Sequence, residues 1–232
     1  MCDVQPILEV IALNAADARA AQEGGADRIE LVTAMSRDGL TPSLETFERV
    51  RAATGLPVRV MLRDRESYSH DGASDLGERA AEFRAAGARE FVLGFLDAGG
   101  AVDVPVFEAL HGCAWTFHRA VDHAADRAAA FRAIRALPGV DCVLTAGSTA
   151  GVGAGLQVLL GEAARSAGPR ILAGGGLRRE HIAPLRAAGV DAFHVGSGVR
   201  RGDWDSPVDA ALVREWRSLL DSGKPAQPPT DR

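Results

Sequence analysis

The chain has few cysteines, and their placement excludes two classes of protein. Its three cysteines, Cys2, Cys113 and Cys142, lie far apart and form no C-x-x-C spacing. A disulfide framework or a thiolate zinc site is therefore not expected, and we assign no metal ligands. The same cysteine usage favours the cytoplasm as the compartment.

Long apolar runs and basic stripes are also missing. No apolar run approaches the roughly 18–20 residues that cross a bilayer, so no membrane partner is expected. The first residues, Met1 to Val4, carry neither a charged n-region nor a long apolar h-region, so we expect no signal peptide. The net charge is -5, and no basic stripe with interleaved aromatic residues occurs, which argues against a nucleic-acid partner. The sequence leaves a homo-oligomer open.

What the chain does contain is a degenerate repeat of a helix end, a glycine and a short strand. Its copies lie at residues 20–31, 83–93, 136–144 and 185–195. The glycine in each copy can adopt the left-handed conformation that ends a helix. Helix, glycine and strand, repeated without a linker, are typical of successive βα units.

The repeat and the apolar runs between its copies predict eight strands. They lie at residues 7–11, 28–32, 58–62, 91–94, 114–118, 142–145, 170–173 and 192–195. A doubly wound open sheet would show the same alternation, but no strand has the polar character of a sheet edge, and charged residues occur within many strands. We therefore predict an α/β fold, a (β/α)8 TIM barrel. It forms a single domain over residues 1–223, followed by a disordered tail over residues 224–232.

Several helix starts can be predicted from capping residues. Thr41 followed by Pro42 gives an N-cap with proline at the first helical position. Asp75, Asp103 and Asp126 can accept hydrogen bonds from the exposed N–H groups of a first turn.

The strand ends carry an unusual number of charged and imidazole side chains. The strand predicted at 114–118 ends in His118, directly followed by Arg119. Glu9, Glu30, Arg63 and His194 also lie within or just past apolar runs. Strands flanked by helices are buried on both faces, so such groups need partners or a function. They make sense together if the strands converge on a common interior, and polar residues at the C-terminal strand ends lie where barrel enzymes keep their sites.

Alternation places Glu9 with Ile11, and Glu30 with Val32, on the face that points into a barrel. Two interpretations follow. The glutamates could pair with Arg63 and Arg119 as a buried structural network. Alternatively, they serve as general bases while the two arginines and His118 hold an anionic or carbonyl substrate.

Glycine-rich loops follow the last two strands. Gly174, Gly175 and Gly176 follow the seventh strand, and Gly196 and Ser197 follow the eighth. Barrels often bind phosphate with these loops, because glycine lets backbone N–H groups approach closely. Tight turns without a ligand are the other interpretation.

Six segments, in this order along the chain, resemble the CutC family of copper homeostasis proteins. They are residues 24–31, 38–43, 116–120, 144–147, 174–176 and 193–194, and the resemblance covers about residues 7–198. It implies a (β/α)8 barrel and a cytoplasmic role in copper handling, with copper as the implied metal.

The chain departs from the family at the residues that would matter most for copper. The family commonly has a cysteine after the Leu-Glu-Val of the first strand and another after the Ile-Glu-Leu of the second, where this chain has Ile11 and Val32. Cu(I) prefers soft sulfur ligands, so the substitutions argue against direct copper binding. Two hypotheses remain: a metal-handling module, and a barrel enzyme of the lyase or isomerase type acting on a small anionic or phosphorylated molecule.

Overall fold

Eight parallel strands close into a barrel in the computed structural model, which describes residues 5–69, 76–103, 110–165 and 168–222. Each strand pairs with the next one along the chain, and β1 pairs with β8. The predicted (β/α)8 fold is thus confirmed, and the open sheet is excluded because the described sheet has no edge strand.

The strands lie close to their predicted positions. They are β1 (Ile7–Ala12), β2 (Arg28–Leu31), β3 (Val58–Met61), β4 (Glu90–Leu93), β5 (Ala114–Phe117), β6 (Val140–Thr145), β7 (Arg170–Ala173) and β8 (Ala192–Val195). The largest difference is in β6, which begins at Val140 rather than at residue 142.

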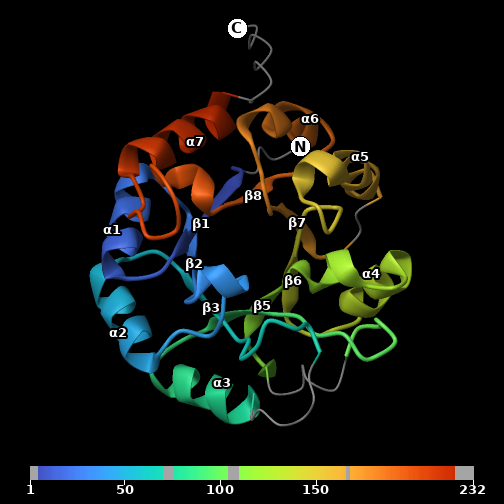
Figure 1. Ribbon diagram of the computed structural model, residues 1–232, viewed down its shortest axis with the longest axis horizontal. Coiled ribbons are helices and arrows are strands. Elements are labelled where there is room, and N and C mark those ends of the chain that lie inside the picture. The colour runs from blue at the N-terminus through green and yellow to red at the C-terminus, as the bar shows by residue number, and fades with distance from the viewer. Residues whose placement is uncertain (1–4, 70–75, 104–109, 166–167, 223–232) are drawn as a thin grey trace, which may run out of the picture.

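Helices surround the barrel as an outer ring (Figure 1). They are α1 (Ala15–Gly24), α2 (Leu44–Ala53), α3 (Leu76–Ala85), α4 (Arg127–Arg135), α5 (Val152–Ala163), α6 (Ile182–Ala187) and α7 (Ala210–Ser222). Short 3-10 helices cover Met35–Arg37, Arg119–His123, Arg179–His181 and Ser197–Val199. None of the described helices combines the length and apolar character that a membrane span requires.

Alternation along the strands separates the two sides of the barrel wall. Leu8, Val10, Ile29 and Leu31 are fully buried in the layer between the sheet and the helices. Glu9 and Glu30 alternate with them and point inward, as the sequence predicts, and they are 0% and 3% exposed. The period of two along a strand therefore brings carboxylates into the barrel.

Four glycines of the repeat lie in the left-handed region between a helix and the next strand. Gly25, Gly87, Gly139 and Gly189 have φ angles between 78° and 99°. A side chain at such a φ is strained, so glycine is the residue that allows the chain to turn from helix into strand there. The interpretation of the repeat as a helix end followed by a strand is confirmed.

The predicted caps have mixed outcomes. Asp126 caps α4, and its side chain accepts a hydrogen bond from the Ala129 N–H at 2.9 Å, as predicted. The prediction for Thr41 is wrong, because Ser43 caps α2 by accepting from the Thr46 N–H. The Thr41 hydroxyl instead bonds the backbone of Arg63 at the end of β3.

Three sequence-based expectations concern residues outside the described ranges. The first is the helix cap expected at Asp75. The second is the helix start expected after Asp103, which falls on residues 104–109. The tail at residues 224–232 is the third.

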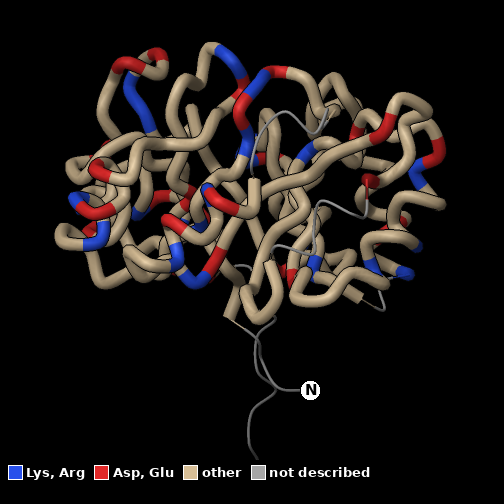
Figure 2. Tube along the Cα trace, turned by 90° about the horizontal axis from the view of Figure 1, so that it is seen from below, with Lys and Arg blue, Asp and Glu red and all other residues tan. Residues whose placement is uncertain are grey.

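Basic and acidic residues are interspersed along the chain trace. In Figure 2 both signs occur around the outer helices, and both also occur toward the middle of the molecule, where the strands run. The charges in the middle are the ones that concern the site.

Candidate functional site at the C-terminal ends of the strands

A cavity of about 230 Å³ opens at the C-terminal ends of the strands. Nine of the residues singled out from the sequence line it: Glu30, Arg63, His118, Arg119, Gly175, Gly176, His194, Gly196 and Ser197. Glu9 and Gly174 do not line it and lie beneath it, in contact with or packed against His194. The fold therefore brings the predicted residues together in and directly under one pocket.

Glu9 forms the floor beneath the pocket with two partners. It is fully buried, and its Oε2 accepts a hydrogen bond from Nε of Arg28 on the neighbouring strand β2. Its Oε1 lies 2.7 Å from Nδ1 of His194 on β8. Burial raises the pKa of Glu9, but Arg28 and His194 outweigh burial and hold it well below its usual range. Glu9 is therefore a permanent buried anion.

Glu30 has the opposite character. It is 3% exposed, its Oε2 lies 3.6 Å from Nε2 of His194, and its Oε1 has no hydrogen-bond partner among the described residues. Burial raises the pKa of Glu30 to about 7, and the nearby Glu9 adds to the shift, while His194 opposes it. A carboxyl with a pKa near neutrality and a free oxygen can both accept and donate a proton.

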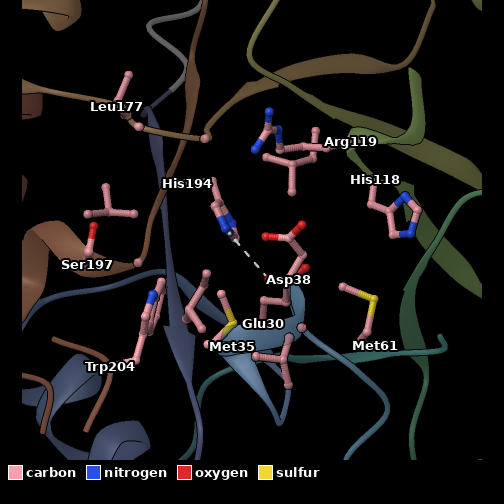
Figure 3. A pocket seen from close by; sticks show the side chains of 18 of the residues that line it. Glu30, Met35, Asp38, Met61, His118, Arg119, Leu177, His194, Ser197 and Trp204 are labelled. Carbon is pink, nitrogen blue, oxygen red and sulfur yellow. Dashed lines mark ion pairs between the residues drawn. The ribbon is translucent and has the colours of Figure 1, made fainter. Parts of the chain in front are cut away.

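His194 joins the two glutamates. Its ring lies between them, and Figure 3 shows the ion pair to Glu30 on the pocket side. Burial lowers the pKa of His194, but the carboxylates of Glu30 and Glu9 outweigh it and raise the pKa overall. Because Nδ1 donates to the ionised Glu9, Nε2 is the nitrogen left to exchange a proton with Glu30.

Arg63 is a buried cation without a carboxylate partner among the described residues. Its guanidinium donates to the carbonyl oxygens of Asp38 and Glu66, and its Nε atom has no partner there. The Tyr68 ring packs over it at 4.6 Å. A buried charge without a counterion is costly, so an anion in the pocket would stabilise Arg63.

Arg119 lies at the pocket rim and retains 29% side-chain exposure. Its Nε donates to Asp122 at 3.2 Å, and Nη2 donates to the Thr149 carbonyl oxygen at 3.2 Å. The guanidinium also lies against Gly175, where a Cβ would meet Arg119 Nε at 2.8 Å. Glycine at 175 thus leaves the space that this arginine occupies.

The loops after β7 and β8 contribute backbone N–H groups. Gly175 and Gly176 have φ angles of 89° and 72°, which favour glycine. The N–H groups of Gly175, Gly176 and Ser197 have no hydrogen-bond acceptor within the part of the chain that the structure describes. The free N–H group of Gly175 beside Arg119, with those of Gly176 and Ser197 elsewhere on the same cavity, is suited to an anion.

His118 is 3% exposed and lies across the pocket from His194 (Figure 3). Its Nδ1 accepts a hydrogen bond from the Ala120 N–H at 3.2 Å, and its Nε2 has no partner among the described residues. Burial, together with the Arg63 and Arg119 cations, lowers the pKa of His118 to about 3.

The structure corrects one predicted pairing. The glutamates do not pair with Arg63 and Arg119, because the strand register places other groups beside them. Glu9 lies level with Arg28 and with His194, and Glu30 lies level with Arg59. Arg63 follows the end of β3, above this level. The charged interior is therefore partly a structural network, built around Arg28 and Arg59.

Several pocket residues were not assigned from the sequence. Asp38, Tyr68 and Trp204 are the main ones, and Met35 and Met61 add two thioethers. Asp38 lies in one of the segments that carry the family resemblance, and Figure 3 shows its carboxylate near Glu30. It has a φ of 58°, a strained conformation for a residue other than glycine, of the kind that clusters at functional sites. Trp204 lies in an irregular loop, and nothing in the sequence pattern pointed to it.

The pocket offers copper no thiolate from the described residues. Ile11 and Val32 line it and pack in an apolar cluster with Met61 and Val92. Cys113 and Cys142 are free and buried in other clusters, so no described thiol reaches the cavity. Among the described residues no group of three or more His, Cys, Asp or Glu side chains is arranged to hold a metal ion.

Comparison with known proteins gives one consistent result. The model of the CutC family matches residues 6–199. The family protein CutC of Enterobacter sp. (strain 638) is 36% identical over 199 residues, which are 83% of this chain and 80% of that protein. Its counterpart from Klebsiella pneumoniae is 35% identical over the same shares.

A solved structure gives the same result for the fold. It bears the name copper homeostasis protein CutC, from Streptococcus agalactiae, and matches with a TM-score of 0.74 at 22% identity. The match covers 83% of this chain and 99% of that one. At this identity the likeness shows the shared barrel.

Proposed function

Starting from the fact that this chain belongs to the CutC family, we propose that its pocket is an enzyme active site for a small anionic molecule. In this proposal Glu30 transfers a proton to or from the bound molecule. The reaction is of the lyase or isomerase type, and the substrate carries a carboxylate or a phosphate group. We place this activity in the cytoplasm, which the free thiols of Cys113 and Cys142 support.

The observation that carries the proposal is the state of Glu30. A buried carboxylate with no role would be expected to have all its oxygens paired, as both oxygens of Glu9 are. Glu30 instead lines the cavity with a free Oε1 and a pKa of about 7. Such a group is matched to acid–base catalysis near neutral pH.

The charge balance of the pocket supports an anionic ligand. Arg63 is buried and has no carboxylate within ion-pair distance among the described residues, and Arg119 is only partly neutralised by Asp122. Asp122 also pairs with Arg127, so its charge is shared between two arginines. The free N–H groups of the loops after β7 and β8 add further positive potential.

The arrangement separates the two tasks of binding and proton transfer. The arginines and the loop N–H groups hold the anionic part of the ligand at the rim. Glu30 then faces the part that reaches inward, and its proton exchanges with His194 Nε2, 3.6 Å away. Glu9 keeps the histidine ring oriented through Nδ1.

Copper handling is the alternative role, because the Streptococcus agalactiae relative is named a copper homeostasis protein. The soft ligands of this pocket are thioethers, and no described thiol lines it. We therefore propose that any contribution of this chain to copper homeostasis does not depend on direct binding of Cu(I) in the pocket.

Ligand-dependent melting tests the proposed function. Inorganic phosphate should raise the melting temperature of the parent protein, by the equivalent of about 2.7 kcal/mol at a hundredfold excess over Kd. Arg119→Gln should remove this effect. Arg178→Gln is the matched control, because Arg178 is exposed, pairs with Glu180 and follows the pocket residue Leu177 without lining the cavity itself. No stabilisation of the parent by phosphate, sulfate or small carboxylates would contradict the proposal.

A further inference from the structure

We infer that the anion bound in this pocket is amphipathic, and that its apolar group packs against a wall formed by Trp204 and neighbouring apolar side chains. The substrate is then a carboxylate or phosphate compound that also carries an aliphatic or aromatic group, rather than a wholly polar molecule such as a sugar phosphate. This inference rests on the proposed function, because it takes the anion site as given and specifies the other end of the ligand.

The cavity has an apolar side and a charged side. Ile11, Val32 and Met61 line it from the C-terminal ends of β1, β2 and β3, and they belong to one apolar cluster. Arg119 and Gly175 line it from the loops that follow β5 and β7. In a closed barrel with this strand order, β1 to β3 lie opposite β5 to β7. The two sides therefore face each other across one cavity.

Met35 and Trp204 complete the apolar side. Both line the cavity, are partly buried and pack against the apolar cluster at the ends of β1 to β3. Figure 3 shows Met35, Met61 and Trp204 along one side of the pocket, away from Arg119. Apolar surface at a cavity gains free energy when an apolar group covers it, and both thioethers and indoles contact aromatic rings favourably.

The fold fixes the position of Trp204 before any ligand binds. A Cβ at Gly196 would overlap with the six-membered ring of Trp204 and with Ile11, so the indole occupies space that glycine leaves. The Arg200 guanidinium packs over the indole at 5.3 Å. Arg200 is itself buried and pairs with Asp17 at 2.8 Å. A wall that is already ordered loses little conformational entropy when a ligand packs on it.

The exposure of Trp204 distinguishes it from the other two tryptophans of the chain. Trp115 and Trp216 have structural roles, and they are 0% and 2% exposed. Trp204 remains partly exposed and lines the cavity. A wholly polar ligand would leave this surface uncovered, whereas an amphipathic anion would cover it and reach the charged side at the same time.

Phosphonates with the same headgroup and different side groups test the inference on the parent protein. Butylphosphonate and phenylphosphonate should bind at least about tenfold more tightly than methylphosphonate in calorimetry, which corresponds to the burial of roughly two methylene groups. Pentanoate, benzoate and acetate form a parallel series for a site that prefers a carboxylate headgroup.

Three variants test whether Trp204 forms the wall. Trp204→Ala should reduce the preference for the larger side groups to less than about threefold, and change methylphosphonate binding by less than about twofold. Trp204→Phe keeps an aromatic ring and should keep most of the preference. Asp205→Ala is the matched control, because Asp205 is the next residue of the same loop, is exposed and does not line the cavity. It should leave all affinities unchanged.

Tryptophan fluorescence reports the contact directly in the parent protein. Because Trp115 and Trp216 are buried and do not line the cavity, Trp204 should dominate any change on binding. Saturation with butylphosphonate should shift the emission to shorter wavelength, as an apolar group replaces water at the indole. Trp204→Phe should lose this shift while it still binds the ligand. Unshifted emission of the saturated parent protein would overturn the inference.

The binding outcomes separate the two levels of the argument. Equal affinities within both the phosphonate and the carboxylate series would overturn the amphipathic ligand and leave the anion site intact. Equal losses for all the probes in Trp204→Ala would do the same, because they would show that Trp204 only maintains the fold. Absence of binding by every phosphonate, by every carboxylate and by inorganic phosphate in the parent protein would overturn the proposed function itself.

Discussion

Nδ1 of His194 lies 2.7 Å from Oε1 of Glu9, and this contact divides the work between two buried glutamates. Glu9 is tied to Arg28 and His194 and remains ionised. The Oε2 atom of Glu30 lies 3.6 Å from Nε2 of the same ring, and its Oε1 atom has no hydrogen-bond partner among the described residues. Two carboxylates on adjacent strands therefore have different proton affinities, a difference that could separate a structural from a chemical role.

The first prediction concerns Glu30→Gln and pH. The pKa of Glu30 is higher in the folded protein than in the unfolded chain, so its favourable contribution is present below about pH 4.5 and is lost as the pH rises through about 7. The variant should gain stability relative to the parent between about pH 5 and about pH 8, on the order of 2 kcal/mol. Urea unfolding at both pH values measures this. Glu45→Gln is the control, because Glu45 is an exposed partner of Arg49. A difference in the free energy of unfolding between the parent and Glu30→Gln that stays constant with pH would contradict the raised pKa of Glu30.

The second prediction concerns Gly175→Ala. A Cβ at this position would lie within about 3 Å of the Arg119 guanidinium and would require a left-handed alanine at φ 89°. The variant should lose stabilisation by phosphate as well as some stability. Gly189→Ala separates the two effects, because Gly189 has φ 95° with no atom within 4 Å of the added Cβ and lies away from the pocket. It should lose a similar amount of stability, about 1 kcal/mol, and keep the phosphate effect. Equal phosphate responses in both variants would show that Gly175 is only a turn residue.

The third prediction concerns the buried pair of Asp17 and Arg200. Asp17 is fully buried, its Oδ2 accepts from Arg200 Nη2 at 2.8 Å, and it also accepts from the Val208 N–H at 3.0 Å. Asp17→Asn leaves the buried Arg200 without its counterion and should cost about 3–5 kcal/mol in urea unfolding. The exposed pair of Arg179 and Glu215 provides the control, and Glu215→Gln should cost less than about 1 kcal/mol. Similar losses in the free energy of unfolding for Asp17→Asn and Glu215→Gln would mean that the buried pair is not needed to hold the loop after β8.

The fourth prediction concerns copper. In a competition with a Cu(I) chelator, the parent protein should retain no more Cu(I) than an unrelated cytosolic protein, because Ile11 and Val32 are apolar. The double variant Ile11→Cys/Val32→Cys should gain binding, since both side chains lie in one cluster at the pocket. Stoichiometric binding by the parent that survives replacement of Cys2, Cys113 and Cys142 would contradict this. Loss of such binding in Met35→Leu/Met61→Leu would then identify a thioether site.

The barrel could be predicted because its signals are local. The four left-handed glycines between a helix and the next strand, and the alternation around Glu9 and Glu30, each depend on a few neighbouring residues. The cap at Thr41 was wrong for a non-local reason. Its hydroxyl bonds the backbone of Arg63, 22 residues away, and Ser43 caps the helix in its place. Capping rules consider only neighbouring residues, so they do not include a hydrogen-bond partner that is distant in the sequence.

The site could be predicted only in part. Alternation shows which strand residues point inward, but not their level along the barrel axis, which depends on register between strands. Arg28 begins its strand, yet register places it beside Glu9 rather than at the rim. Asp38 and Trp204 reach the pocket from irregular loops, and such loops have no periodicity that would reveal their direction.

The interior of the barrel is filled beneath the cavity. Cys142, Leu144, Leu172 and Ala192 pack there, and the buried Arg28 and Arg59 occupy further space. The described residues therefore leave no opening through the barrel floor, and anything formed in the cavity leaves from the same end of the barrel at which the starting molecule entered. Product and substrate compete for the same passage and the same charged groups. Steady-state kinetics of the proposed reaction should accordingly show product inhibition that is competitive with substrate.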